Sequence, residues 1–155
     1  MLGQDWSSQW QRVGRRLEDV RAVYTGAPGG TDAAIDVVLS FFETVHHLKD
    51  WLTNDPTSGV TSSQVHSLID GSPVLKLCAD LANGSKHFKL DPQRRTQTGD
   101  HSTEIARNDV VVYVGTGTSA HRFYTASGGK EDDVLQIAEQ AVNQWRVFLS
   151  GRGLI

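Results

Sequence analysis

The sequence predicts a mainly helical domain, a bundle of four long helices and one short helix with a β-hairpin inserted before the last helix. Apolar residues recur at spacings of three and four in four long segments, which is typical of amphipathic helices. Near residue 110 this spacing gives way to a run of β-branched residues, which favours strands. With 155 residues and 38% apolar content the chain can bury one sizeable core, so we expect a single domain over residues 1–155.

The first two predicted helices cover residues 5–25 and 32–54. The first ends at a Gly-Ala-Pro-Gly-Gly segment, and the second ends at Asn54-Asp55-Pro56. Thr31 or Asp32 is expected to cap the second helix with its side-chain oxygen. Each helix carries an apolar stripe that we expect to face the core: Trp6, Trp10, Val13, Leu17, Val20 and Tyr24 in the first, and Ala34, Val38, Phe41, Phe42, Val45, Leu48 and Leu52 in the second.

Two further helices are predicted in the middle of the chain. A short one over residues 61–69 follows from Thr61 and Gln64, which have the spacing of a capping box. The next, over residues 73–89, starts at Ser72-Pro73, where a hydroxyl precedes a proline at the first helical position. Its expected buried side consists of Val74, Leu77, Cys78, Leu81 and Phe88.

The hairpin is predicted over residues 103–126, with strands at 110–114 and 121–125 joined by the flexible segment 115–119. A two-stranded hairpin alone is marginally stable, so we expect it to pack on the helices or on a second copy. Glu131, Asp132 and Asp133 are expected in the first turn of a last helix over residues 131–150, where negative charge is favourable.

The charge and cysteine content exclude several classes of function. Because 18 acidic residues outnumber 15 basic ones, no global basic field draws the protein to nucleic acid. A local basic cluster that includes Lys89, Arg94 and Arg95 is either a phosphate contact or a solvated patch. The single cysteine, Cys78, excludes an internal disulfide, and its apolar neighbours predict a packed thiol. We expect neither a signal peptide nor a membrane span, and therefore a cytoplasmic location.

Four polar residues, Lys76, Asp80, Asn83 and His87, form one column on the predicted helix over residues 73–89. At about 100° per residue they fall within an arc of roughly 60°. Such a column is either the solvated side of the helix or a set of chemical groups aimed into a cleft. The sequence leaves both interpretations open.

The predicted helix over residues 32–54 carries a second polar column, which includes His47 and Asp50. If the two columns face each other, a carboxylate would raise the basicity of a nearby histidine, and Lys86 could neutralise a phosphate. Such a site would suit metal-independent phosphodiester cleavage or phosphate binding. His47, Asp50, Asp80 and His87 also offer metal ligands, but their spacing matches no metal-binding signature. We therefore predict no metal and no other cofactor.

Two short runs resemble the HEPN-like superfamily, the all-helical domains of many toxin and phage-defence RNases. They are Asn-Gly-Ser-Lys-His from Asn83 to His87 and His-Leu-Lys-Asp-Trp-Leu from His47 to Leu52. The chain is also similar, over most of its length, to small uncharacterised bacterial and phage proteins that carry both runs. The superfamily's catalytic pattern is an arginine, a polar residue and a histidine. His87 matches the histidine and Asn83 the polar residue, while Ala82 stands at the arginine position.

The resemblance implies an RNA- or nucleotide-directed phosphoryl enzyme, an RNase of the toxin or defence type. It also implies a homodimer that places two copies of the His87-bearing helix across a shared groove. Two alternatives are a catalytically silent, dimeric module that binds a protein partner and a nucleotide-binding sensor. A membrane is not an expected partner. The implied roles are general acid and base for His87, phosphate contact for Asn83 and Lys86, and support for Asp80, His47 and Asp50.

Overall fold

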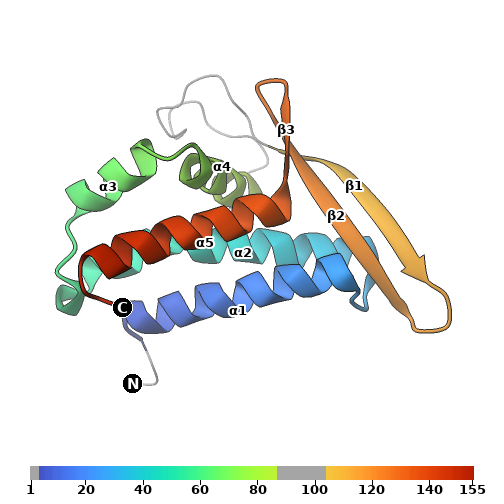
Figure 1. The fold of residues 1–155 in the computed structure, drawn as a ribbon, viewed down its shortest axis with the longest axis horizontal. Coiled ribbons are helices and arrows are strands. Elements are labelled where there is room, and N and C mark those ends of the chain that lie inside the picture. The colour runs from blue at the N-terminus through green and yellow to red at the C-terminus, as the bar shows by residue number, and fades with distance from the viewer. Residues whose placement is uncertain (1–3, 87–103) are drawn as a thin grey trace.

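The structure is a computed structural model that describes residues 4–86 and 104–155, with Ser85 and Lys86 described by their backbone alone. Its helices and strands follow one another as Figure 1 shows. The helices are α1 (Trp6–Thr25), α2 (Gly30–Asn54), α3 (Ser62–Asp70), α4 (Pro73–Lys86) and α5 (Val134–Gly151), with a 3-10 turn at Pro56–Ser58. The strands are β1 (Glu104–Tyr113), β2 (Thr118–Ser127) and β3 (Lys130–Asp133).

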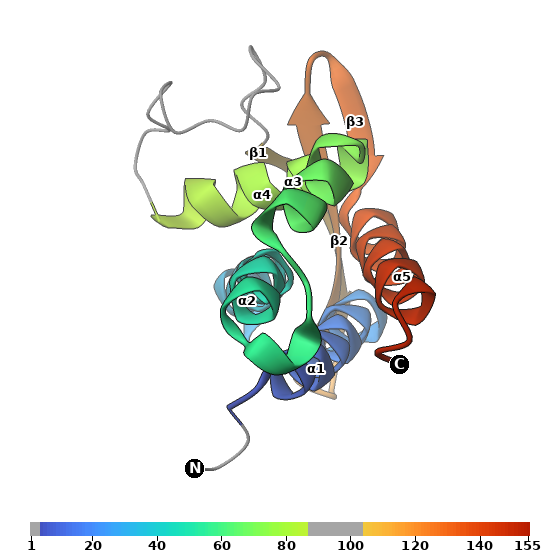
Figure 2. The ribbon, with the colours of Figure 1, turned by 90° about the vertical axis from the view of Figure 1, so that its left-hand side faces the viewer.

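The three longest helices lie side by side, and the sheet crosses the end of the bundle where α1 ends and α5 begins (Figures 1 and 2). Helix α2 packs against α1 on one side and against α4 on another, and α5 also contacts α1 and α4. The β1–β2 hairpin extends beyond the ends of the helices (Figure 1). The predicted fold class, a mainly helical bundle with strands before the last helix, is therefore confirmed.

The sheet has three strands, in the order β1-β2-β3, instead of the two that the sequence predicted. Residues 130–133 pair with β2 in antiparallel register, from Ser127↔Lys130 to Tyr124↔Asp133. Gly128 and Gly129 make this turn possible because both have positive φ, at 56° and 77°. Helix α5 consequently begins at Val134, and Asp133 caps it by accepting a hydrogen bond from the Gln136 N–H. The prediction that helix residues start at Glu131 was wrong.

The hydrophobic core lies between the helices and the inner face of β2. Every member of the predicted α2 stripe is buried, whereas Trp10 and Tyr24 of the α1 stripe are half-buried. Helix α4 is buried over a wider arc than predicted, because α2, α3 and α5 all pack against it. Its buried residues are Leu75, Cys78, Ala79, Asp80, Leu81 and Ala82, while Val74 and Leu77 are half-buried.

The helix starts test three sequence predictions. Thr61 and Gln64 form the expected capping box on α3, and Ser72 Oγ accepts the Leu75 N–H at the start of α4. The predicted cap of α2 was wrong, because the N-cap is Gly29, with φ at 104° and no side-chain hydrogen bond. Glycine tolerates this left-handed conformation, so α2 begins at Gly30 without a polar cap.

Tyr24 joins the last turn of α1 to the sheet and to α5. Its hydroxyl accepts hydrogen bonds from Phe123 N at 3.2 Å and from Leu135 N at 3.1 Å. The same hydroxyl lies 3.0 Å from Phe123 O, to which it can donate. Burial raises the pKa of Tyr24 to about 12. One phenol therefore fixes the positions of three elements relative to one another.

The Cys78 side chain is buried, as its apolar neighbours predicted. Burial raises the pKa of its thiol, which keeps it protonated and poorly nucleophilic. Among the helices that the structure describes, none is both long and apolar enough to cross a membrane.

Candidate functional site

Asp80 lies on the wall of a pocket between α4 and the β2–β3 turn. The pocket has a volume of about 400 Å³, and Asp80 is only 5% exposed. Lys76, which belongs to the same predicted polar column, lies one helical turn away and lines the same pocket. The pocket is lined by Pro73, Lys76, Leu77, Asp80, Ser127, Lys130 and Asp132. We call it the α4–β3 pocket.

Two local features place the walls of the α4–β3 pocket. Ser72 caps α4 and also hydrogen-bonds Gln144 on α5, which fixes where α4 starts. The Gly128-Gly129 turn folds β3 back along β2, which brings Lys130 and Asp132 to the pocket.

The α4–β3 pocket combines charged groups with an apolar wall. Lys76 contributes a cation from α4 and Lys130 contributes one from β3. The Lys130 ammonium lies 3.3 Å from Asp132 Oδ1, and its side chain is 76% exposed. Pro73 and Leu77 provide the apolar surface. Such a pocket can take a small ligand that has both an anionic group and an apolar or aromatic part.

Helix α4 presents its other predicted residues in different surroundings. The Asn83 side chain is half-buried. Ala82, at the arginine position of the HEPN-like pattern, is 1% exposed. An arginine here would have to place its charge in a packed interior, where an unpaired charge is costly. The interpretation of the α4 column as a purely solvated face fails at Asp80, which is buried.

Helix α2 packs against α4, and of the two residues predicted on α2 only Asp50 lines a pocket that the structure describes. His47 is half-buried, and its ring centroid is 6.3 Å from that of His46. Asp50 is exposed near the end of α2 and lines a different pocket, which has a volume of about 550 Å³. The carboxylates of Asp50 and Asp80 thus line two separate pockets.

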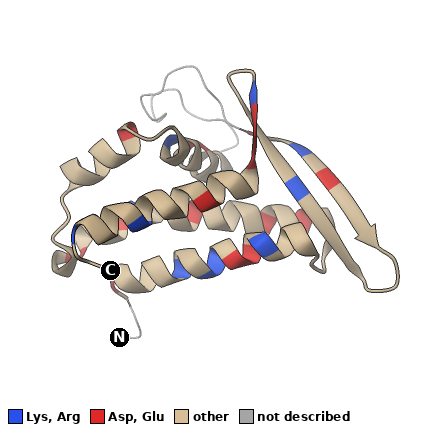
Figure 3. Ribbon diagram, in the orientation of Figure 1, with Lys and Arg blue, Asp and Glu red and all other residues tan. Residues whose placement is uncertain are grey.

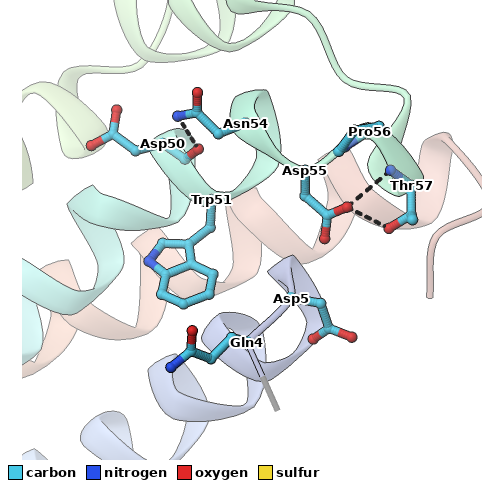
Figure 4. Close-up of a pocket in the computed structure, with 8 residues that line it drawn as sticks. All are labelled: Gln4, Asp5, Asp50, Trp51, Asn54, Asp55, Pro56 and Thr57. Carbon is cyan, nitrogen blue, oxygen red and sulfur yellow. Dashed lines mark hydrogen bonds between the residues drawn. The ribbon is translucent and has the colours of Figure 1, made fainter. Parts of the chain in front are cut away.

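The pocket that includes Asp50 lies where α1 begins and α2 ends (Figure 4). Figure 4 shows the carboxylates of Asp5 and Asp50 pointing away from each other on either side of Trp51. Asp55 accepts hydrogen bonds from the Thr57 hydroxyl, from Trp6 N and from Thr57 N, which hold the pKa of its carboxyl below the ordinary value. The described residues contain no group of three or more His, Cys, Asp or Glu side chains that could hold a metal ion.

Several predicted site residues lie outside the described part of the chain. These are His87, which carries the implied acid–base role, and the candidate phosphate contacts Lys89, Arg94 and Arg95. Lys86 ends α4, and its backbone alone is described. The proposed convergence of His47 with His87 therefore stays a prediction.

Sequence reasoning missed the two charged residues that β3 contributes to the α4–β3 pocket, Lys130 and Asp132, because no third strand was predicted. It also missed a buried polar cluster at His121, which is 2% exposed. His121 Nε2 lies 2.9 Å from Ser119 Oγ, and Nδ1 lies 3.2 Å from Asn108 Nδ2. Alternation along β2 could have revealed this burial, since His121 shares a face with Phe123 and Thr125.

Comparisons with family models, with curated proteins and with solved structures found no significant match. The fold and pocket together define a helical domain with a small antiparallel sheet and a charged pocket at their junction.

Proposed function

We propose that the chain is a nucleotide-binding module, with the ligand in the α4–β3 pocket. The observation that carries the proposal is the position of Lys76 and Asp80, two members of a sequence-predicted polar column, on the wall of one pocket. Its volume of about 400 Å³ is within the range of about 300–1,000 Å³ that is usual for small-molecule sites. The proposal requires binding only and does not depend on catalysis.

Each wall of the α4–β3 pocket suits a different part of a nucleotide. The ammonium groups of Lys76 and Lys130 suit a phosphate, to which lysine binds as a compact charge. Leu77 and Pro73 suit the flat, apolar face of a base. The carboxylates of Asp80 and Asp132 accept hydrogen bonds, so they suit ribose hydroxyls or the amino group of a base.

Calorimetric titration with ADP, adenosine and inorganic phosphate tests this assignment. We expect Lys76→Gln and Lys130→Gln each to weaken ADP binding about 10-fold, since a charge-assisted contact contributes about 1.5–3 kcal/mol and 1.4 kcal/mol is tenfold. Adenosine should bind more weakly than ADP and should not respond to either substitution. Arg146→Gln is the control, because Arg146 is exposed on α5 and lies outside the pocket lining. Equal ADP affinity in all four proteins would contradict the proposal.

A metal-independent RNase is the second candidate, and the sequence run from Asn83 to His87 supports it. The burial of Ala82 weighs against it, because the helix position that would supply a phosphate-stabilising arginine is buried. This candidate therefore depends on His87 as general acid and base.

Cleavage of RNA in the presence of a metal chelator tests the role of His87. If the RNase assignment holds, His87→Ala should slow cleavage by about 10²–10⁴-fold, the usual contribution of general acid–base catalysis. His66→Ala is the matched control, since His66 is exposed on α3, and it should cleave at the wild-type rate. Indistinguishable rates for His87→Ala and wild type would remove the catalytic assignment and leave the binding proposal untouched.

A further inference from the structure

In the part of the chain that the structure describes, β1 is an edge strand whose outer side is unpaired. β1 pairs with β2 along one side, and β2 is covered on its other side by β3 and by the bridge from Ala27 to Ser119. Within the described residues no strand pairs with the outer side of β1. An edge of this kind presents backbone N–H and C=O groups that can pair with another chain.

Apolar side chains cover the end of β1 and the residue that follows it. Val110, Val111, Val112 and Tyr113 are 44%, 56%, 68% and 44% exposed, and Val114 is 96% exposed. Figure 3 shows that this end of the hairpin carries no charged residue. The other edge strand, β3, is short and consists of the charged residues 130–133, which discourages pairing.

The exposed residues of β1 point to both faces of the sheet. Val110 pairs with His121 and Val112 pairs with Ser119, and both partners are buried. Val110 and Val112 therefore lie on the face toward the helices, and Val111 and Tyr113 lie on the opposite face. All four remain exposed because the hairpin extends past the helices (Figure 1). A partner must therefore supply a strand for the edge and apolar side chains for both faces.

We propose that β1 pairs antiparallel with β1 of a second copy of this chain, about a twofold axis near Val111. The β1 strand of a second copy has an unpaired outer side and apolar residues on both faces, so it can pair with this edge and cover its apolar side chains. Such an interface is self-complementary, as twofold symmetry requires. An axis at Val111 places Val110 opposite Val112 of the second copy and joins the apolar runs of both strands.

Charge disfavours one of the antiparallel alternatives to this register. An axis at Asp109 would place the two Asp109 carboxylates opposite each other, which is unfavourable. With the axis at Val111, Asp109 lies opposite Tyr113 of the second copy. Arg107 stays engaged within its own chain, since its Nε lies 2.6 Å from Glu131 Oε1 and its guanidinium lies 3.9 Å from the Tyr124 ring centroid.

A second copy also fits the hairpin better than a membrane surface does. A tip that enters a bilayer needs apolar residues on both of its strands, because unsatisfied polar groups are costly in lipid. The connection here is Gly-Thr-Gly from Gly115 to Gly117, and β2 begins with Thr118 and Ser119. Apolar character is thus confined to the edge strand, as expected for pairing between strands.

Sedimentation velocity of the full chain over a concentration series tests the proposal. We expect wild type to dimerise and Val112→Lys to weaken the dimer more than about 10-fold, because lysine opposes edge pairing. Val147→Lys is the matched control, since Val147 is 65% exposed on α5, and it should dimerise as wild type does. Thermal melting by circular dichroism should show that both variants are folded. A wild-type monomer at every concentration, or a dimer that Val112→Lys leaves intact, would overturn the proposal.

Cysteine cross-linking tests the register. Val111→Cys should form an intermolecular disulfide, because paired residues across antiparallel strands have Cα atoms about 4.5–5.5 Å apart, within disulfide range. Val147→Cys should not cross-link, and the buried Cys78 should not compete. A dimer without the Val111→Cys cross-link would refute this register. Binding to lipid vesicles by a monomeric wild type, lost in Val112→Lys, would instead assign the patch to a membrane.

Discussion

Replacing Trp145 by alanine should lower the free energy of unfolding by about 3–5 kcal/mol, the usual cost of removing a buried aromatic side chain. Trp145 is 1% exposed and lines a narrow gap in the core together with Val45 of α2, Ile69 of α3 and Leu75 of α4. Phe148 packs edge-on against it, with ring centroids 5.8 Å apart. The substitution therefore opens a cavity where four helices converge.

Urea denaturation followed by circular dichroism measures the cost of Trp145→Ala. Val147→Ala is the control on the same helix, because Val147 is 65% exposed and its truncation should change stability by no more than about 0.5 kcal/mol. A cost of less than about 1.5 kcal/mol for Trp145→Ala would mean that α5 does not close the core as the structure has it.

Tyr24→Phe should lower the free energy of unfolding by about 2–3 kcal/mol. The substitution keeps the ring but removes the acceptor of Phe123 N and Leu135 N, and an unsatisfied buried donor costs about 1–3 kcal/mol. Tyr124→Phe is the matched control, since it keeps its ring beside the Arg107 guanidinium. If both variants melt at the wild-type temperature, Tyr24 does not join α1 to the sheet and α5.

The raised pKa of Tyr24 also makes the stability of the wild-type protein depend on pH, and Tyr24→Phe removes this dependence. The phenol titrates near 10.0 when unfolded and at about 12 when folded, so the folded state holds the proton more tightly. This contribution to stability is complete below pH of about 10 and is lost as the pH rises through about 12. Wild type should thus lose stability over this interval, and Tyr24→Phe should lose less of it. If the free energy of unfolding fell equally with pH in the two proteins, the Tyr24 hydroxyl would not be buried as the structure has it.

The helical part of the fold was predictable because its signals are local. The α2 stripe from Ala34 to Leu52 and the Thr61–Gln64 capping box each lie within one segment of chain. The third strand was not predictable in the same way. Three consecutive acids suit the first turn of a helix, and the turn at Gly128-Gly129 that pairs them with β2 gives only a weak strand signal.

The candidate site was predictable in part. The α4 column identified Lys76 and Asp80 as neighbours, since helical spacing alone brings them to one face. Their surroundings depend on β3, which supplies Lys130 and Asp132 from a distant part of the sequence. The burial of Ala82 likewise depends on tertiary packing around α4, which no local sequence pattern specifies.

Titration of the isotope-labelled protein with ADP, followed by amide chemical shifts, tests the central claim most directly. The claim is that the α4–β3 pocket holds a nucleotide phosphate beside Lys76 and Lys130. The account predicts saturable shifts at the first turns of α4 and along β3, and their loss in the double variant Lys76→Gln, Lys130→Gln. No shifts at millimolar ADP, or shifts confined to other parts of the molecule, would contradict it.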